Sequence, residues 1–249
     1  MSYGRFRVIV IGGGHAGVEA AWAAANLLPA SEFGAGAVAL VTIDPSKIGV
    51  MSCNPAIGGL AKGQLVREID AMGGLMGLAA DATGIHFKVL NTSKGPAVRG
   101  PRCQNDKHAY AEEVRRLIAG REEIRVVGGV VEELAVEDGR CVGVVVTGSP
   151  GSTRLLSADA VVLTTGTFMR GLMHTGETRT PGGRHGEAAA STISAALRGL
   201  GFELGRLKTG TPPRLRRGTI DWEALPEHPG DERPQPFSDL SGIRESAFG

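Results

Sequence analysis

Aromatic residues are scarce in this sequence, at 4% of the 249 residues, so large rings cannot supply most of a core. Glycine is abundant instead: its 38 residues are about twice the usual share of roughly 7%. This composition indicates many tight turns and close backbone approaches, for which a cofactor lying against the backbone is one reason. With 42% hydrophobic residues the chain can still build one large domain, or a domain plus a smaller lobe, which argues against disorder and fibres.

Cysteines are also few and widely separated, at Cys53, Cys103 and Cys141. They form no CxxC pair and no His/Cys spacing of a metal site, so the sequence predicts neither a disulfide framework nor a bound metal. The absence of a disulfide framework favours a reducing, cytoplasmic environment.

Long apolar runs are missing as well. The first apolar run of the chain, Val8 to Ile11, is far shorter than a signal-peptide core. No apolar run approaches the roughly 20 residues of a membrane span. We therefore expect a soluble protein without a membrane partner. The charges nearly cancel, with 27 Lys and Arg against 26 Asp and Glu, so the net charge names no partner.

The beginning of the chain predicts a βαβ unit and an α/β fold. Phe6 to Ile11 and Val38 to Ile43 are β-branched runs typical of buried strands, and the Ala-rich stretch Ala16 to Leu28 predicts the helix between them. Such strands are parallel and joined by a right-handed crossover.

The remaining pattern is mixed. Ser46 to Gly63 is rich in Gly, Asn and Pro and predicts a long loop. Helical spacing occurs at Leu65 to Leu78, Asp106 to Ile118 and Ala188 to Leu200, whereas the chain beyond Gly205 is rich in Pro and Arg without periodicity.

Between Ile124 and Leu163 the pattern predicts a β-meander that leads back into the main sheet. It consists of four short apolar runs, the last three separated by the turns Asp138-Gly139 and Pro150-Gly151. The runs are Ile124 to Val127, Val130 to Val136, Cys141 to Thr147 and Ala160 to Leu163.

The turn after the first predicted strand carries the dinucleotide-binding fingerprint Gly12-Gly13-Gly14-His15-Ala16-Gly17. Gly12 permits the tight turn, Gly14 lets the backbone approach a pyrophosphate, and Gly17 permits close helix packing. Backbone amides and the helix dipole then meet the negative charge. A glycine-rich turn without a ligand is the alternative interpretation.

Two further features extend this site. Asp44, after the second predicted strand, is the candidate for the ribose hydroxyls, although it lies about 30 residues past the glycines rather than the usual ~20, and a turn-capping role explains it equally well. Thr165 and Gly166 end the strand that returns from the meander. Together with the meander, which begins at Gly128 and Gly129, they favour FAD over NAD.

Longer blocks of sequence carry a family resemblance. The fingerprint is followed by Met51-Ser52-Cys53-Asn54-Pro55-Ala56-Ile57-Gly58-Gly59, by Asn91-Thr92-Ser93-Lys94-Gly95-Pro96-Ala97-Val98-Arg99, and by Arg206-Leu207-Lys208-Thr209-Gly210-Thr211-Pro212-Pro213-Arg214. In this order they resemble the tRNA uridine 5-carboxymethylaminomethyl modification enzymes, also called the glucose-inhibited division protein A family.

The resemblance implies a glutathione-reductase-type FAD-binding Rossmann domain over residues 1–203 and the start of a second, substrate- or nicotinamide-side domain over residues 204–249. It also implies a reaction at carbon 5 of the wobble uridine of tRNA, with FAD as cofactor, NADH as reductant and methylene-tetrahydrofolate as carbon donor. Members of the family act with a GTPase partner subunit and as homodimers.

The resemblance also assigns roles to single residues. Gly12 to Gly17 hold the FAD pyrophosphate, and Val131 and Ser191 fall at further cofactor contacts. Cys53 matches a family cysteine near the flavin, where a thiolate could add to uracil or the thiol could protonate it. The alternative for Cys53 is a small buried residue that packs a turn, and this structural role is the expectation for Cys103 and Cys141.

Two basic stretches are candidates for phosphate contacts. The first has five cations in the twelve residues from 206 to 217 and no acid: Arg206, Lys208, Arg214, Arg216 and Arg217. It suits RNA binding that weakens with salt, with a merely solvated loop as the alternative. The second suits RNA or flavin phosphate equally well and comprises Lys88, Lys94, Arg99, Arg102 and Lys107.

The chain has less than half the length of a typical family member. A later block with a second cysteine, a later glycine block that closes over FAD, and the helical region that binds tRNA and the partner have no counterpart in it. A stand-alone FAD-binding module without catalysis is therefore the alternative function. The folate-dependent tRNA uracil methyltransferases share the fold but do not explain the blocks around Cys53 and Lys94.

Overall fold

The computed structural model describes residues 5–148, 152–187, 189–213 and 215–241, which form two compact units. The first contains the described residues of Met1–Val50, Gly73–Leu75 and Ala111–Gly205, and the second those of Met51–Met72, Met76–Tyr110 and Arg206–Gly249. Each unit has its own sheet. The predicted division of functional domains at residues 203 and 204 stays a prediction.

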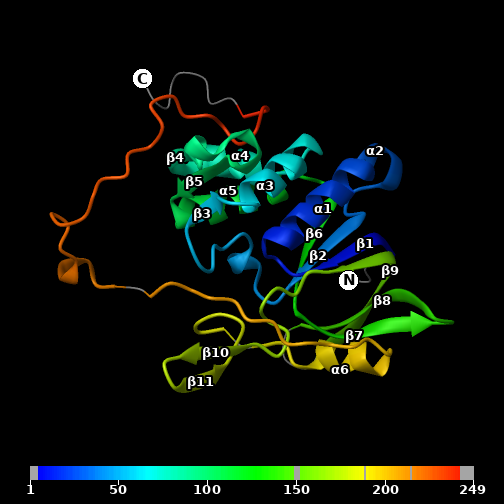
Figure 1. The fold of residues 1–249 in the computed structure, drawn as a ribbon. Coiled ribbons are helices and arrows are strands. Elements are labelled where there is room, and N and C mark those ends of the chain that lie inside the picture. Colours follow the sequence, from blue (N-terminus) through cyan, green and yellow to red (C-terminus); the bar gives the residue numbers. More distant parts are fainter. Residues whose placement is uncertain (1–4, 149–151, 188, 214, 242–249) are drawn as a thin grey trace. The chain divides into compact units, whose positions relative to one another are not determined.

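The first unit is built on a parallel sheet. Its strands are β1 (Phe6–Ile11), β2 (Val38–Thr42), β6 (Ile124–Gly128) and β9 (Thr153–Leu163), adjacent in the order β6-β2-β1-β9 (Figure 1). Ile9 pairs with Ala39 on one side and with Val161 on the other, and Ile9 and Ala39 are fully buried. Apolar β-branched runs are typical of strands covered on both faces. The predicted α/β fold with a parallel core is confirmed.

A β-meander follows, as predicted. β7 (Val130–Glu137), β8 (Arg140–Thr147) and β9 are antiparallel neighbours, and Asp138 and Gly139 both have positive φ (50° and 75°), as a type I′ hairpin turn requires. The first of the four apolar runs is β6, which joins the parallel sheet beside β2 rather than the meander. The last run belongs to a longer strand that begins at Thr153. Pro150 and Gly151 lie outside the described residues.

Helices cover this sheet system. α1 (His15–Leu27) packs against β1, β2 and β6, and α6 (Thr192–Gly199) packs against β7 (Figure 1). The prediction for α1 is correct to one residue, but α6 begins four residues later than expected, because Ala190 pairs in a parallel bridge with Met169 and bonds to the backbone of Phe168 and Arg170. Smaller elements are α2 (Ala30–Phe33), η1 (Pro45–Lys47), and the hairpin of β10 (Leu172–Thr175) and β11 (Thr178–Pro181).

The second unit contains a three-stranded antiparallel sheet in the order β3-β5-β4. The strands are β3 (Ala56–Gly58), β4 (Gly84–Leu90) and β5 (Gly100–Asn105), with η2 (Thr92–Lys94) and η3 (Pro96–Val98) between β4 and β5. The helices α3 (Lys62–Ala71) and α4 (Met76–Thr83) complete it, and α5 (Lys107–Ala119) begins in this unit and ends in the first.

Two sequence predictions are wrong in this region. The single helix expected from Leu65 to Leu78 is divided into α3 and α4, because Gly73 takes a positive φ of 83° and Gly74 follows it. The long loop expected from Ser46 to Gly63 contains β3 and the first turn of α3. The prediction for α5 is confirmed: Asp106 precedes it and accepts hydrogen bonds from the backbone N–H groups of His108 and Ala109.

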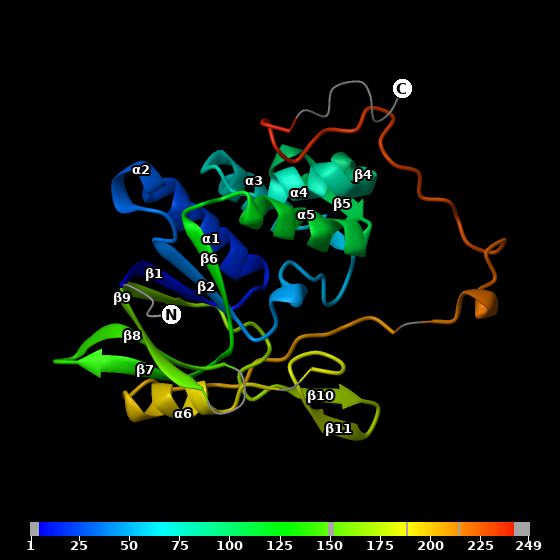
Figure 2. The same cartoon turned by 180° about the vertical axis from the view of Figure 1, so that it is seen from behind.

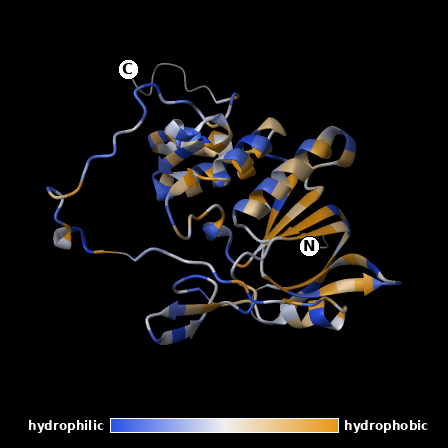
Figure 3. Cartoon of the chain, viewed as in Figure 1, coloured by the Kyte–Doolittle hydropathy of each residue, from blue (hydrophilic) through white to orange (hydrophobic). Residues whose placement is uncertain are grey.

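The chain after Gly205 has little regular structure. Apart from η4 (Arg217–Thr219), its described residues form no helix or strand (Figure 2), and they are hydrophilic over most of their length (Figure 3). Residues 228–241, which we call the strap, return to the small sheet of the same unit. There the Asp231 carboxylate accepts the backbone N–H of Val89 at 2.8 Å, and the buried Phe237 ring packs beside Gly58.

None of the helices in the described part of the chain is long and apolar enough to cross a membrane.

Candidate functional site

The turn between β1 and α1 has the geometry of a dinucleotide-binding turn. Gly12 has a φ of 114°, which favours glycine, and its N–H donates to the Val41 carbonyl at 2.8 Å. A Cβ at Gly17 would lie 1.7 Å from the Gly12 carbonyl oxygen, so only glycine lets the helix start this close to the strand. The roles predicted for these two glycines in shaping the turn agree with this geometry.

Gly13 and Gly14 differ in their surroundings. A Cβ at Gly13 would approach Thr42 Oγ1 and Ile48 Cγ1 to 2.9 Å, and the Gly13 carbonyl accepts the N–H of Gly49 at 3.0 Å. A Cβ at Gly14 would meet nothing within 4 Å. Gly14 is the residue preceding α1, so this open space lies where the first-turn amides of the helix, which have no partners within the helix, are directed. An anion can therefore approach the backbone at Gly14 without meeting other atoms of the protein.

His15 begins α1, and its imidazole is buried. Burial, and secondly the charge of Arg184, lower the pKa of His15 below its ordinary value. The ring is therefore neutral at pH 7 and adds no positive charge to the turn. This leaves the helix amides and dipole as the groups that attract an anion there.

Arg184 supplies a positive charge that sequence reasoning missed. Its guanidinium forms an ion pair with Glu187 at 2.8 Å and lies over the Phe168 ring, 5.5 Å from the centroid. Its charge is a lesser cause of the lowered pKa values of His15 and Asp44. The only sequence signal was its position after Gly182 and Gly183, a turn that bears no dinucleotide motif.

Asp44 follows β2 and is exposed. Its Oδ1 accepts the backbone N–H of Ser46 at 2.9 Å. The pKa of Asp44 is lowered first by hydrogen bonding from the Ser46 side chain and second by this backbone hydrogen bond. The capping role is thus observed, and the carboxylate is ionised at pH 7. The predicted ribose contact stays a prediction.

The other predicted cofactor residues belong to the same unit. Thr164, which precedes Thr165 and Gly166, donates its N–H to Ile11 at 2.9 Å and its hydroxyl to the same carbonyl at 2.6 Å. The return from the meander therefore ends beside the glycine turn. Thr164 is a second residue that sequence reasoning missed, because its role depends on the pairing of β9 with β1.

The start of the meander also reaches this edge of the sheet. Gly129 donates its N–H to the Thr42 carbonyl at 2.9 Å, which places the start of β7 beside the end of β2. Val131, two residues later, is buried in the core against Val146. Ser191 is the exposed residue that precedes α6.

Cys53 lies in the second unit and is exposed, so the interpretation as a small buried packing residue is wrong. Its Sγ lies 3.5 Å from Thr211 Oγ1, which joins two of the sequence blocks quoted above. Cys103 is fully buried in β5, and burial raises the pKa of its thiol to about 12. The structural role predicted for Cys103 agrees with this environment.

The first basic stretch is exposed throughout its described part, which comprises Arg206, Lys208, Arg216 and Arg217. Arg214 lies outside the described residues. Four cations of the second basic stretch lie on β4, β5 and the segment between them, and the fifth, Lys107, begins α5. Within the described ranges, no group of three or more His, Cys, Asp or Glu side chains could hold a metal ion.

Sequence comparison identifies a family. Residues 7–245 match the family described as Glucose inhibited division protein A. A relative from Rhodopirellula baltica, described as tRNA uridine 5-carboxymethylaminomethyl modification enzyme MnmG, is 49% identical over 95% of this chain. A relative with the same description from Granulibacter bethesdensis is 51% identical, also over 95% of this chain.

Solved structures agree. The form I crystal structure of GidA from Aquifex aeolicus superposes with a TM-score of 0.86, at 45% identity over 96% of this chain and 38% of that chain. A GidA-related protein from Thermus thermophilus, 19% identical, shares the fold over 80% of this chain and 70% of its own, with a TM-score of 0.55.

The chain spans about a third of the length of the curated relatives it matches, since 36% of the Rhodopirellula baltica and Granulibacter bethesdensis proteins are covered.

Proposed function

This chain belongs to the Glucose inhibited division protein A family, and from that premise we propose that it is the FAD-binding part of an enzyme that modifies the wobble uridine of tRNA. The product we propose carries a carboxymethylaminomethyl or aminomethyl group at carbon 5 of the uracil. The observation that carries the proposal is the open space at Gly14, directly before α1, in a chain about half identical to relatives described as tRNA uridine modification enzymes.

The residues of the first unit would hold FAD as follows. The first-turn amides of α1 would bind the pyrophosphate at Gly14. Because His15 is neutral, its imidazole adds no charge to this interaction. Arg184 adds a positive field, and the ionised Asp44 accepts from a ribose hydroxyl. Thr165 and Gly166, Val131 and Ser191 line the remaining path of the cofactor. When bound, the flavin supplies the reducing chemistry of the reaction.

We propose the other participants on the family relation alone. NADH is the reductant, methylene-tetrahydrofolate the carbon donor, and a GTPase subunit the partner, and the full-length enzyme is a cytoplasmic homodimer. Cys53 is our candidate for the catalytic thiol, since it is exposed in a loop that also contains the amide of Asn54. An alternative function is an FAD-binding module without catalysis.

Flavin titration tests the cofactor directly. We expect the purified chain to bind FAD and to change its fluorescence or absorption spectrum, because the first unit offers the turn, the open space and the meander of an FAD domain. NAD in the same titration is the control and should bind more weakly. Tight binding of NAD without any response to FAD would contradict the proposal.

A second test concerns the exposed basic segment. We expect weak binding of tRNA that decreases steeply with salt, because each neutralised phosphate releases counterions. Changing Arg206, Lys208, Arg216 and Arg217 to Ala should reduce both the affinity and the salt slope in filter binding. If the quadruple variant keeps the parental affinity and slope, the segment makes no phosphate contacts and its charges serve the fold or the cofactor.

A further inference from the structure

The segment from Gly84 to Asn105, which includes β4 and β5, contains no Asp or Glu. It carries four cations, Lys88, Lys94, Arg99 and Arg102. A surface hairpin usually intersperses charges of both signs, because like charges repel each other. The acid-free hairpin therefore concentrates positive charge on one small element of the second unit.

Lys88 and Arg102 face each other across the ladder, since they are direct partners in the pairing of β4 with β5. Like charges in opposite positions destabilise a strand pair. Phe87 and Cys103, the next pair along the ladder, point to the other face and are buried. The core thus occupies one face of the hairpin, and the two cations share the other.

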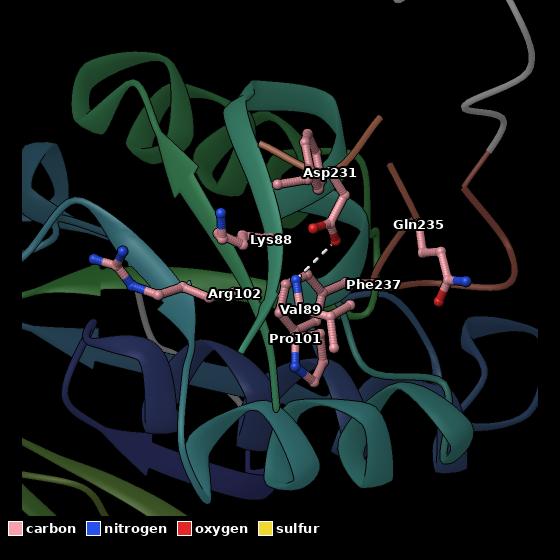
Figure 4. Close-up of a pocket in the computed structure, with 8 residues that line it drawn as sticks. Lys88, Val89, Pro101, Arg102, Asp231, Gln235 and Phe237 are labelled. Atoms are coloured by element: carbon pink, nitrogen blue, oxygen red, sulfur yellow. Dashed lines mark hydrogen bonds between the residues drawn. The ribbon is translucent and has the colours of Figure 1, made fainter. Parts of the chain in front are cut away.

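Neither cation has a carboxylate partner among the described residues. Lys88 Nζ donates to the Pro229 carbonyl at 2.6 Å, and an Arg102 guanidinium nitrogen donates to Gln104 Oε1 at 3.1 Å, so both bonds are to neutral groups. The nearby acid, Asp231, accepts the backbone N–H of Val89 instead. Figure 4 shows Lys88 and Arg102 extending to the same side of the strands, away from Phe237 and Gln235.

Room and further charge surround this pair. A Cβ at Gly59 would reach no atom closer than Arg102 Cδ at 4.0 Å, so the surface beside Arg102 is open. Lys94 and Arg99 are exposed in the segment between β4 and β5, where the Arg99 guanidinium donates to the carbonyl of Thr92 at 3.3 Å. The hairpin offers guanidinium and ammonium donors that neutral groups hold in place without cancelling their charge.

We propose that this basic hairpin face, formed by Lys88, Arg102, Lys94 and Arg99, binds the phosphate backbone of RNA. The inference rests on the proposed function, because tRNA is the polyanion that such an enzyme must hold. Two adjacent cations on a ladder match consecutive phosphates better than a single small anion, and backbone contacts position an RNA without reading its sequence. Repulsion between Lys88 and Arg102 is relieved when each cation contacts a phosphate.

Filter binding of tRNA over a range of salt concentrations tests the proposal with the double variant Lys88→Gln/Arg102→Gln. Glutamine keeps a polar side chain with hydrogen-bond donors and removes the charge. If the pair contacts two phosphates, the plot of log affinity against log salt should become shallower in the double variant, with a slope smaller in magnitude by about 1.4–1.8. The affinity at low salt should decrease about tenfold or more.

The matched control is Arg140→Gln/Arg198→Gln, which removes the same charge from exposed positions of the first unit. It should leave the affinity within about twofold and the slope unchanged if local contacts rather than net charge bind the RNA. An equal loss in the control, or no salt-dependent binding by the parent chain, would overturn the proposal.

FAD titration of both variants is the second readout. A loss of FAD affinity with unchanged tRNA binding would overturn the proposal and assign the face to a flavin phosphate. Whichever of these results is obtained, FAD binding by the parent chain tests separately whether the protein binds FAD as proposed.

Discussion

Replacing Gly14 with valine should abolish FAD binding while the fold is retained. Gly14 has φ −77° and ψ −176°, an extended conformation that valine adopts without strain, and a Cβ there meets no atom within 4 Å. The side chain would instead fill the space in which a pyrophosphate approaches the backbone. We expect at least about a 100-fold loss of affinity, equivalent to about 2.8 kcal/mol. Flavin fluorescence titration measures it.

The neighbouring Gly17 provides the contrasting control. Gly17→Ala places a Cβ 1.7 Å from the Gly12 carbonyl oxygen, so this variant should lower the melting temperature, whereas Gly14→Val should not. Circular dichroism of both variants separates loss of the site from loss of the fold. An unchanged FAD affinity in a folded Gly14→Val variant would show that the cofactor does not cross this turn.

The sequence predicts the glycine turn well because each of its positions is constrained by local backbone geometry. Gly12 favours glycine because of its own positive φ, Gly17 must be glycine because of the Gly12 carbonyl oxygen, and the strand before the turn is mostly apolar. The type I′ turn at Asp138 and Gly139 is predictable for the same reason. Features fixed by a few consecutive residues can be found without knowledge of the tertiary structure.

Features that depend on pairing between distant segments were not predictable. β4 and β5 contain Lys, Arg, Pro and Gly, which weaken any strand pattern, and they are strands because each pairs with the other. Arg184 contributes to the lowered pKa values of His15 and Asp44 although it is far from both residues in the sequence. The same holds for Thr211, whose hydroxyl lies beside Cys53 although 158 residues separate them.

The strap depends on a buried carboxylate, Asp81, and removing it should release residues 237–241. Asp81 accepts the backbone N–H groups of Phe237 at 2.7 Å and Ser238 at 2.9 Å, and also the hydroxyl of Ser241. Burial raises the pKa of Asp81, but the three donors oppose this shift. In Asp81→Ala each buried amide that loses its acceptor costs about 1–3 kcal/mol. The segment should therefore leave its site and hydrate its amides in water.

The matched control is Asp239→Ala, on the strap itself. The Asp239 side chain is 82% exposed and pairs with Arg67 at 3.3 Å, and a surface ion pair of this kind contributes about 0–1 kcal/mol. We expect amide hydrogen exchange at Phe237 and Ser238 to accelerate at least ~30-fold in Asp81→Ala and only a few-fold in Asp239→Ala. The Phe237 ring, 1% exposed beside Gly58, should become accessible to proteolysis in the first variant alone. Equal exchange rates in the two variants would mean that Phe237 packing, rather than the Asp81 carboxylate, holds the strap. In that case Phe237→Ala should release it where Asp81→Ala does not.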